Sequence, residues 1–380
     1  MTHFGNYATA SQMDDLTVLQ LQPLDVESYR EAERAGDKAV MDRLAAPFVQ
    51  GCSELTFGAL HSKEDGVSKM RWDDVTQFYD LLFSVPPAIL REYGGDKISM
   101  GYMGPGSETI GSPEIWKSSW YDSVEGRELF GKGYCPTKRQ RIGWVGQRSL
   151  CFDEEMPFLQ WSGSCDPFTT EEHEFFEYGF KRLLPHIRRK QQRLTEVPIR
   201  VLLRYSMGME TSTIDHVMDQ LTTKVDGRVE LPGVLRGVMY HTGLSAEVGD
   251  TFTNFHADSG LGAAVYARLL THRQFPHKKP ELHVKLPDES VVGVNIEPGA
   301  YSWNTGWSLI NLFRALEEEG YKGNVAPEHE LHDLTEHAVF RQVRDVERLG
   351  IILFPQGNLD MRVGDRTLRE IRQDHISQHI

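Results

Sequence analysis

The segment DTFTNFHADSGL, residues 250–261, places a histidine and an aspartate one residue apart in a stretch rich in Thr and Phe. These residue types predict a β-strand. Because residues two apart in a strand point to the same face, we expect His256 and Asp258 to lie side by side. Such a pair can bind a metal ion, or it can be an ordinary hydrogen-bonded pair at the edge of a strand.

The sequence after residue 198 predicts a β-rich second half. Many short strands separated by Gly, Pro, Asp and Asn are typical of a sandwich or jelly roll. The expected strands are IRVLLRY, RGVMYH, AAVYARLLTH, ELHVKL, SVVGVNI, GAYSWNTG, HAVFRQV and RLGIILF. One short helix is expected among them, over residues 308–323.

The first half of the sequence predicts helices at residues 25–50, 72–86 and 169–194, where apolar residues recur at helical spacing. The expected fold class is therefore mainly β with flanking helices. We expect a double-stranded β-helix (a cupin-like jelly roll) over residues 198–380. A mixed α/β segment over residues 1–197 should pack on it to form one structural unit.

The composition limits the kinds of partner. The chain has 380 residues, of which 39% are hydrophobic and 25% charged, as in a soluble globular protein. Its net charge of −14 argues against nucleic-acid binding, which requires a basic surface. The four cysteines form no zinc-type close pair, and neither a secretory leader nor a membrane span is visible. We therefore expect a cytoplasmic protein with free thiols and no membrane partner.

A third ligand would complete a metal site. Two histidines and one carboxylate on one face, with three positions left open, are typical of non-haem iron(II) sites. His337 is the favoured third ligand because it begins a predicted strand. The hairpin partner of that strand would bring Arg348 near the metal. His329, in a more polar segment, remains the alternative.

Several segments resemble the isopenicillin N synthase-like family of iron(II)- and 2-oxoglutarate-dependent oxygenases. The resemblance covers roughly residues 75 to 365. The segment around His256 resembles the family's first ligand strand, and the hairpin that contains Arg348 resembles its third-ligand and cosubstrate strands. The segments that carry the resemblance are NFHADSGL, VVGVNIEPGAYSWNTGWSL, EHAVFRQVRDVERLGIILF and LRGVMYH, and more loosely FSVPPAIL, MGYMGPGSE and WKSSWYDS.

The resemblance implies a set of cofactors and binding residues. Iron(II) would be held by His256, Asp258 and His337, and 2-oxoglutarate and O₂ would complete the reaction. Arg348 would bind the far carboxylate of 2-oxoglutarate, because a guanidinium can form two parallel bonds to a carboxylate. Tyr240 and the position of Gly350 would complete this cosubstrate site.

The sequence departs from the family in four places. Ala338 follows the third ligand where Arg is usual, and Gly350 stands where a Ser normally contacts the cosubstrate. Trp307 stands where Asp is common. The spacing between Asp258 and His337 is also longer than usual, because the predicted helix lies between them. For this reason His329 remains an alternative third ligand.

The resemblance implies an oxidoreductase, a dioxygenase that oxidises a C–H bond by hydroxylation, desaturation or oxidative cyclisation. Its substrate would be an amino acid or a compound of specialised metabolite biosynthesis. Tyr102, Phe255, Ile352 and Phe354 are candidates for the pocket wall. The alternatives are an iron oxidase of the same fold that does not use 2-oxoglutarate, and a non-catalytic barrel protein.

Overall fold

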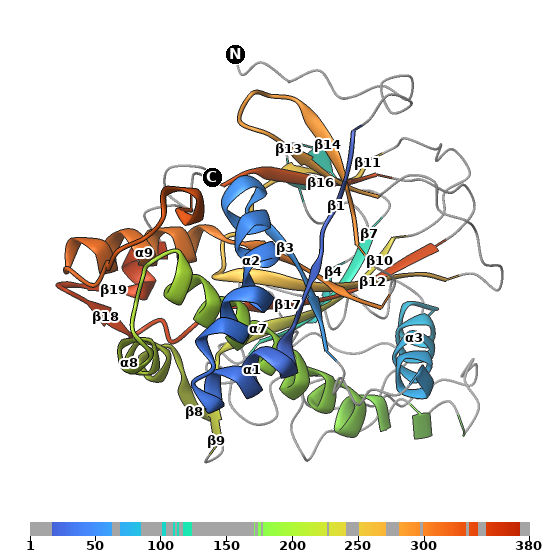
Figure 1. Ribbon diagram of the computed structural model, residues 1–380. Helices are drawn as coiled ribbons and strands as arrows, with labels where there is room; N and C mark the ends of the chain where they lie inside the picture. Colours follow the sequence, from blue (N-terminus) through green and yellow to red (C-terminus); the bar gives the residue numbers. More distant parts are fainter. Residues whose placement is uncertain are drawn as a thin grey trace.

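Two β-sheets lie at the centre of the molecule, one of five strands and one of eight (Figure 1). The structure is a computed structural model. It describes residues 17–62, 69–84, 101–103, 109–110, 112–113, 117–123, 171, 174–175, 178–225, 228–240, 251–270, 281–296, 299–331, 334–340 and 347–372.

The five-stranded sheet has the order β1-β14-β13-β16-β11. Its first strand pairs parallel to β14, and the other pairs are antiparallel. The strands are β1 (Val18–Gln20), β14 (Val291–Asn295), β13 (Leu282–Lys285), β16 (Glu336–Phe340) and β11 (Thr251–His256).

The eight-stranded sheet has the order β2-β3-β15-β12-β17-β10-β7-β4. Only its β2·β3 pair is parallel among the described pairs. The strands are β2 (Pro23–Asp25), β3 (Phe57–His61), β15 (Tyr301–Thr305), β12 (Gly262–Leu270), β17 (Glu347–Pro355), β10 (Gly233–Tyr240), β7 (Lys117–Ser123) and β4 (Gly101–Met103).

Three short two-stranded ladders complete the described strands. They are β5 (Thr109–Ile110) with β6 (Ser112–Pro113), β8 (Thr223–Val225) with β9 (Arg228–Glu230), and β18 (Arg362–Val363) with β19 (Arg366–Thr367). All described pairs between strands of the second half are antiparallel. This pairing agrees with the expected jelly-roll type of core.

The stretch predicted as one helix at residues 25–50 forms two helices, α1 (Val26–Ala35) and α2 (Lys38–Leu55). Gly36 ends the first helix at φ +69°, a left-handed conformation that glycine adopts without a steric penalty. The Asp37 side chain then accepts a hydrogen bond from the Val40 amide and caps the second helix. The other described helices are α3 (Lys69–Ser84), the π-helical turn η4 (Gly179–Leu183), α7 (Leu184–Tyr205), α8 (Thr211–Leu221), α9 (Trp307–Glu318) and the 3₁₀ turn η5 (Pro327–His329).

The strand predicted for IRVLLRY is wrong, because residues 199–205 form the last two turns of α7. Ile199, Val201, Leu202 and Leu203 are all buried. A short continuous apolar run fits a buried helix as well as a buried strand, so periodicity could not separate them. α7 also crosses residue 198 without a break, so the change from helix to strand comes later, at β8.

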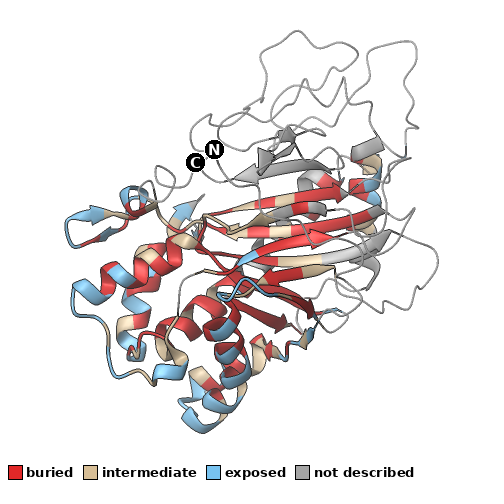
Figure 2. Cartoon of the chain, turned by 90° about the horizontal axis from the view of Figure 1, so that it is seen from above, coloured by how far each residue is buried: buried red, intermediate tan, exposed pale blue. Residues whose placement is uncertain are grey.

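The main hydrophobic core lies between the eight-stranded sheet and the helices (Figure 2). Trp303 of β15, Phe48 of α2 and Leu202 of α7 belong to it. A smaller cluster joins the two sheets: Val238 and Ile352 from the eight-stranded sheet pack with Val339 from the five-stranded one. The eight-stranded sheet is thus covered by helices on one face and by the second sheet on the other, an arrangement compatible with a jelly-roll core.

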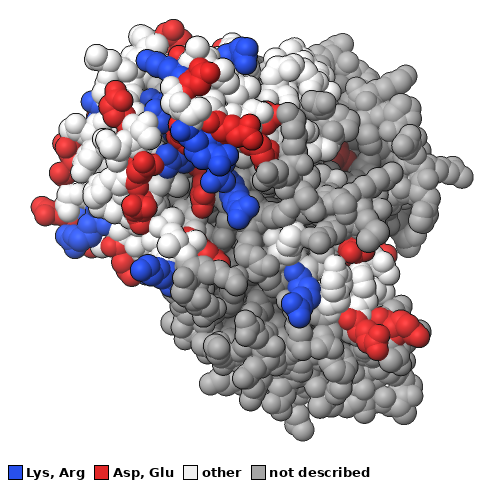
Figure 3. Space-filling model, turned by 60° about the horizontal axis from the view of Figure 1, so that its bottom comes forward, with Lys and Arg blue, Asp and Glu red and all other residues white. Residues whose placement is uncertain are grey.

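Acidic and basic side chains are interspersed over the described part of the face in Figure 3. None of the helices in the described ranges has the length and apolarity needed to cross a membrane. Cys52 is a free, buried thiol, whereas Cys135, Cys151 and Cys165 lie outside the described residues.

Candidate metal centre

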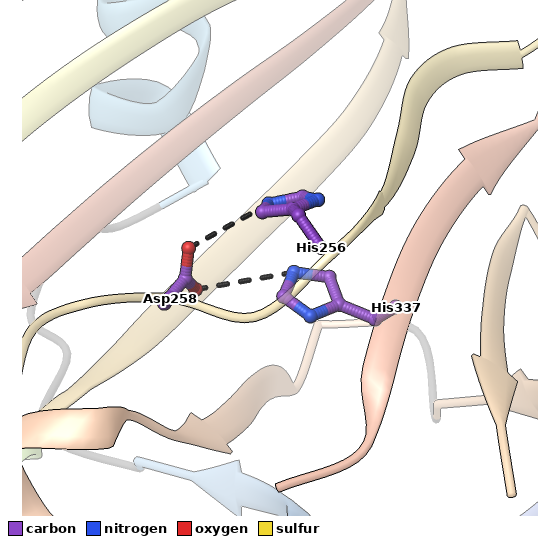
Figure 4. A group of neighbouring side chains, drawn as sticks. All are labelled: His256, Asp258 and His337. Atoms are coloured by element: carbon purple, nitrogen blue, oxygen red, sulfur yellow. Dashed lines mark ion pairs between the residues drawn. The ribbon is translucent and has the colours of Figure 1, made fainter. Parts of the chain in front are cut away.

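His256, Asp258 and His337 converge in one group (Figure 4). Each offers a ligand atom, and these atoms lie within 4.8 Å of one another. The His256 Nε2 atom is 3.6 Å from Asp258 Oδ1, and the His337 Nε2 atom is 3.9 Å from Asp258 Oδ2. The two imidazole rings are 4.3 Å apart, because His256 and His337 are register partners on the antiparallel strands β11 and β16.

The backbone places Asp258 differently from the prediction. β11 ends at His256, so the carboxylate comes from the loop that follows and not from the same face of one strand. The pairing of β11 with β16 shifts register before His256, and such irregularities disrupt the regular alternation of side chains. The side chains still meet, but the loop and not the pleat of the strand determines their distance.

The N-terminus of α9 holds this loop. The Trp307 amide donates to the Asp258 carbonyl at 2.9 Å, and the Ser308 amide donates to the Gly260 carbonyl at 3.1 Å. The first amides of a helix have no partner within the helix, so they are available for such bonds. Gly306 makes the approach possible, because a Cβ there would lie 2.1 Å from the Gly260 carbonyl oxygen. The helical insert noted in the sequence, and Trp307 within it, thereby fix the ligand loop.

Asn304 holds the carboxylate itself. Its Nδ2 atom donates a hydrogen bond of 2.6 Å to Asp258 Oδ2. Asn304 lies on β15 and is only 3% exposed, so water does not compete for this bond. Hydrogen bonds to ligand side chains orient them and tune metal affinity in known metal sites. The bond therefore fixes the direction in which the carboxylate points.

The strand β3 of the eight-stranded sheet supports His337. The Phe57 ring meets the His337 ring edge-on at 5.3 Å and 76°. Two residues before the histidine, Thr335 donates from its hydroxyl to the Leu55 carbonyl at 2.5 Å and contacts the Thr56 hydroxyl at 2.8 Å. The junction of α2 and β3 is thus tied to the start of β16, which limits the movement of His337.

The protonation states suit metal binding. Burial, and then the neighbouring His256, lower the pKa of His337 to about 3, so it is neutral near pH 7. Burial alone would raise the pKa of Asp258, but the hydrogen bond from His256, the charges of the two imidazoles and the Asn304 amide outweigh it. Its pKa therefore lies well below the usual range. Neutral imidazole and ionised carboxylate are the forms that bind metal ions.

The donor set fits a divalent iron site. Neighbouring ligand atoms at about 2.1 Å from a metal ion lie about 3 Å apart. The two distances from the Asp258 carboxylate to the imidazoles, 3.6 and 3.9 Å, are somewhat longer than that spacing. Two imidazoles and one carboxylate match the set that leaves iron(II) positions open for other molecules. His329, the alternative ligand, lies in η5, where its ring contacts Tyr205 at 6.4 Å, and it is outside the group.

The predicted hairpin of β16 and β17 is wrong, because β16 pairs with β11 and β13 in the five-stranded sheet and β17 pairs with β10 and β12 in the eight-stranded sheet. The expected cosubstrate residues lie on neighbouring strands of the eight-stranded sheet. Arg348 on β17 is a register partner of Tyr240 on β10, and Gly350 is a register partner of Val238. The side chain of Tyr240 lies outside the described residues. The Nε atom of Arg348 donates to Glu281 Oε2 at 2.6 Å, a partner that the sequence did not suggest.

The predicted pocket residues fall into three groups. Ile352 lies between the sheets with Val238 and Val339, and Phe354 is two residues further along the same face of β17. Phe255 packs on Ala338 and Phe340, with its ring 6.0 Å from that of Phe340, so β11 places it on the face opposite His256. That is not the face that a substrate beside His256 would contact, because adjacent residues of a strand point in opposite directions. The side chain of Tyr102 on β4 lies outside the described residues.

Sequence reasoning missed Asn304, Phe57 and Glu281. Each lies on or beside a strand far from the ligands in sequence; Asn304 and Asp258, for example, are 46 residues apart. A polar side chain within a predicted apolar strand was the available signal for Asn304. No comparable signal marked the other two residues.

Comparison with known proteins shows the fold. No family model matches the sequence, and no curated protein matches it. The structure of JOX2 in complex with 2OG, Fe and JA is similar with a TM-score of 0.54 at 16% identity, over 94% of this chain and 80% of that chain. A full-length Neurospora crassa protein in complex with alpha-KG and thymine gives a TM-score of 0.56 at 16% identity, over 96% of this chain and 98% of that chain. The chain thus shares the overall fold of these two proteins, whose structures contain 2OG or alpha-KG.

Proposed function

We propose that this chain is an iron(II)- and 2-oxoglutarate-dependent dioxygenase that oxidises a C–H bond of a small molecule. The observation that carries the proposal is the convergence of two histidines and one aspartate in a fold shared with oxygenases that bind this cosubstrate. The two facing sheets are taken as the double-stranded β-helix of that fold. An amino acid or a specialised metabolite is the proposed class of substrate.

The residues of the site have different proposed roles. His256, Asp258 and His337 hold the metal, and the hydrogen bond from Asn304 keeps the carboxylate in its binding orientation. Iron(II) bound there with 2-oxoglutarate and oxygen would supply the oxidising chemistry. Arg348 binds the far carboxylate of the cosubstrate, with Tyr240 as a second donor where Gly350 offers none.

The interior walls limit what can react. Val238, Val339 and Ile352 form an apolar cluster between the two sheets, on the face of β16 that also carries His337. Apolar walls exclude water and leave orientation of the substrate to a few polar groups. Ile352, Phe354 and Tyr102 are the proposed pocket residues.

The decisive test combines binding with product analysis. Anaerobic protein is titrated with iron(II) and 2-oxoglutarate, and the weak visible charge-transfer band is recorded. After oxygen is admitted, released succinate is measured. Asp258→Ala should lose the band and succinate release, because it removes the only anionic ligand of the group. Asp288→Ala, in the exposed turn between β13 and β14, is the matched control and should behave as wild type.

The result separates the alternatives. Oxygen consumption without succinate would support an iron oxidase of the same fold that does not use 2-oxoglutarate. No iron binding at micromolar metal would support a non-catalytic barrel protein.

A further inference from the structure

An internal ion pair joins the two sheets at the proposed cosubstrate site. The Arg348 Nε atom on β17 lies 2.6 Å from the Oε2 atom of Glu281, which directly precedes β13 of the other sheet. The two side chains are 8% and 18% exposed. Such a short, charge-assisted hydrogen bond in a sheltered place is stronger than a surface ion pair.

The pair lies on the same side of β17 as the interior cluster. The register of β17 with β10 is continuous from Arg348 to Phe354, so alternate residues share a face. Ile352 on this face packs against the cluster that contains Val339 of β16, two residues beyond the proposed ligand His337. Arg348 therefore lies on the interior face, toward the end of the strand at which Glu281 enters from β13.

Glu281 is also fixed by its backbone. Its carbonyl accepts a hydrogen bond of 2.9 Å from the Phe340 amide of β16. The next residue, Leu282, is the register partner of Val339. The backbone of Glu281 is thus fixed beside β16, which keeps its carboxylate close to Arg348.

We propose that Glu281 is a specificity-determining residue that sets how strongly Arg348 binds a diacid cosubstrate. This inference rests on the proposed function. The guanidinium carries one positive charge, and the carboxylate of Glu281 lies against it. A cosubstrate carboxylate must share that charge with Glu281 and is repelled by it. Glu281 therefore weakens the binding of 2-oxoglutarate and makes saturation depend on its concentration.

The size of the effect follows from Coulomb's law. Two carboxylates that share one guanidinium lie about 6 Å apart. At effective dielectric constants of about 20 to 40, removing one of two like charges at that distance changes affinity by roughly 10- to 100-fold. Glu281→Gln removes the charge but keeps an oxygen that accepts from Arg348 Nε. The variant should therefore bind 2-oxoglutarate at least about 10-fold more tightly, while Arg348 stays oriented.

The experiment is an anaerobic titration of the iron(II) protein with 2-oxoglutarate, followed by the charge-transfer absorption. Wild type is compared with Glu281→Gln, with Glu281→Ala as a second variant. Glu336→Gln is the matched control, because that carboxylate is exposed and lies near Lys285. A second probe is 2-oxopentanoate, which has the same carbon chain but a methyl group in place of the far carboxylate. Its affinity should change less than 2-fold.

Each outcome of the titration either supports or overturns the inference. Tighter binding of 2-oxoglutarate by the Glu281 variants, without a matching gain for 2-oxopentanoate, supports the inference; if 2-oxopentanoate binds too weakly to measure, the result for 2-oxoglutarate decides. Unchanged or weaker binding would show that Glu281 only positions Arg348 and would overturn it. An equal gain for both probes, or failure of both Glu281 variants to fold, would overturn it as well. If wild type forms no band with 2-oxoglutarate, the proposed function itself fails.

Discussion

Replacing Asn304 by alanine should weaken metal binding far more than it weakens the fold. The Asn304 Nδ2 atom donates a 2.6 Å hydrogen bond to Asp258 Oδ2, and the asparagine is 3% exposed. A hydrogen bond to a charged group contributes about 1.5–3 kcal/mol. Since about 1.4 kcal/mol corresponds to a factor of ten, the dissociation constant of the metal should rise roughly 10- to 100-fold.

The assay is a direct metal titration. Cobalt(II) in place of iron gives visible absorption bands whose growth reports binding and whose positions report the geometry of the ligands. Asn304→Ala should raise the dissociation constant and shift the bands, because the carboxylate is free to rotate. Asn295→Ala is the matched control, since Asn295 is an exposed strand asparagine that donates to Gln20.

The thermal stability of the metal-free variant completes the test. A dissociation constant within 2-fold of wild type would refute the idea that Asn304 positions Asp258. A large loss of stability in the metal-free protein, with unchanged band positions, would assign Asn304 a purely structural role.

Three further outcomes follow from the described contacts. Glu33→Gln should lower the free energy of unfolding by about 2–3 kcal/mol in urea titrations, somewhat less than the usual cost of breaking a buried ion pair. The cost is lower because Arg200 and Arg204, which both bind Glu33, keep other partners when its charge is removed. A loss of stability below about 0.5 kcal/mol would contradict this prediction. Burial lowers the pKa of His337 to about 3, whereas an unfolded histidine is protonated below about pH 6.5. Between these two values only the unfolded chain binds the proton, so the metal-free protein should lose stability as the pH falls through this range. His337→Gln should show a shallower fall of the urea midpoint between pH 7.5 and 5, and identical slopes would contradict the assignment. Burial also raises the pKa of Cys52, so iodoacetamide at pH 8 should leave its peptide unmodified in the native protein and label it in urea, as read by mass spectrometry; rapid native labelling would show that this part of the core opens.

The sequence by itself determined the local features of the site. A β-rich segment followed by His-x-Asp, and a later strand that starts with His337, predicted the three side chains that the structure brings together. Hydrophobic alternation and turn residues act between near neighbours, so strands such as β12, β14 and β17 could be predicted from their own residues. The helix at α9 was predicted for the same reason.

The tertiary structure decided what depends on distant partners. Residues 199–205 are helical because α7 packs on the eight-stranded sheet, and their apolar run alone fits either element. Asp258 lies in a loop fixed by α9 and by Asn304, and Arg348 meets Glu281 from the opposite sheet. These contacts join residues 46 or more positions apart in the chain. No local period encodes such a pair, because it forms only when sheet register and helix docking bring the two strands together.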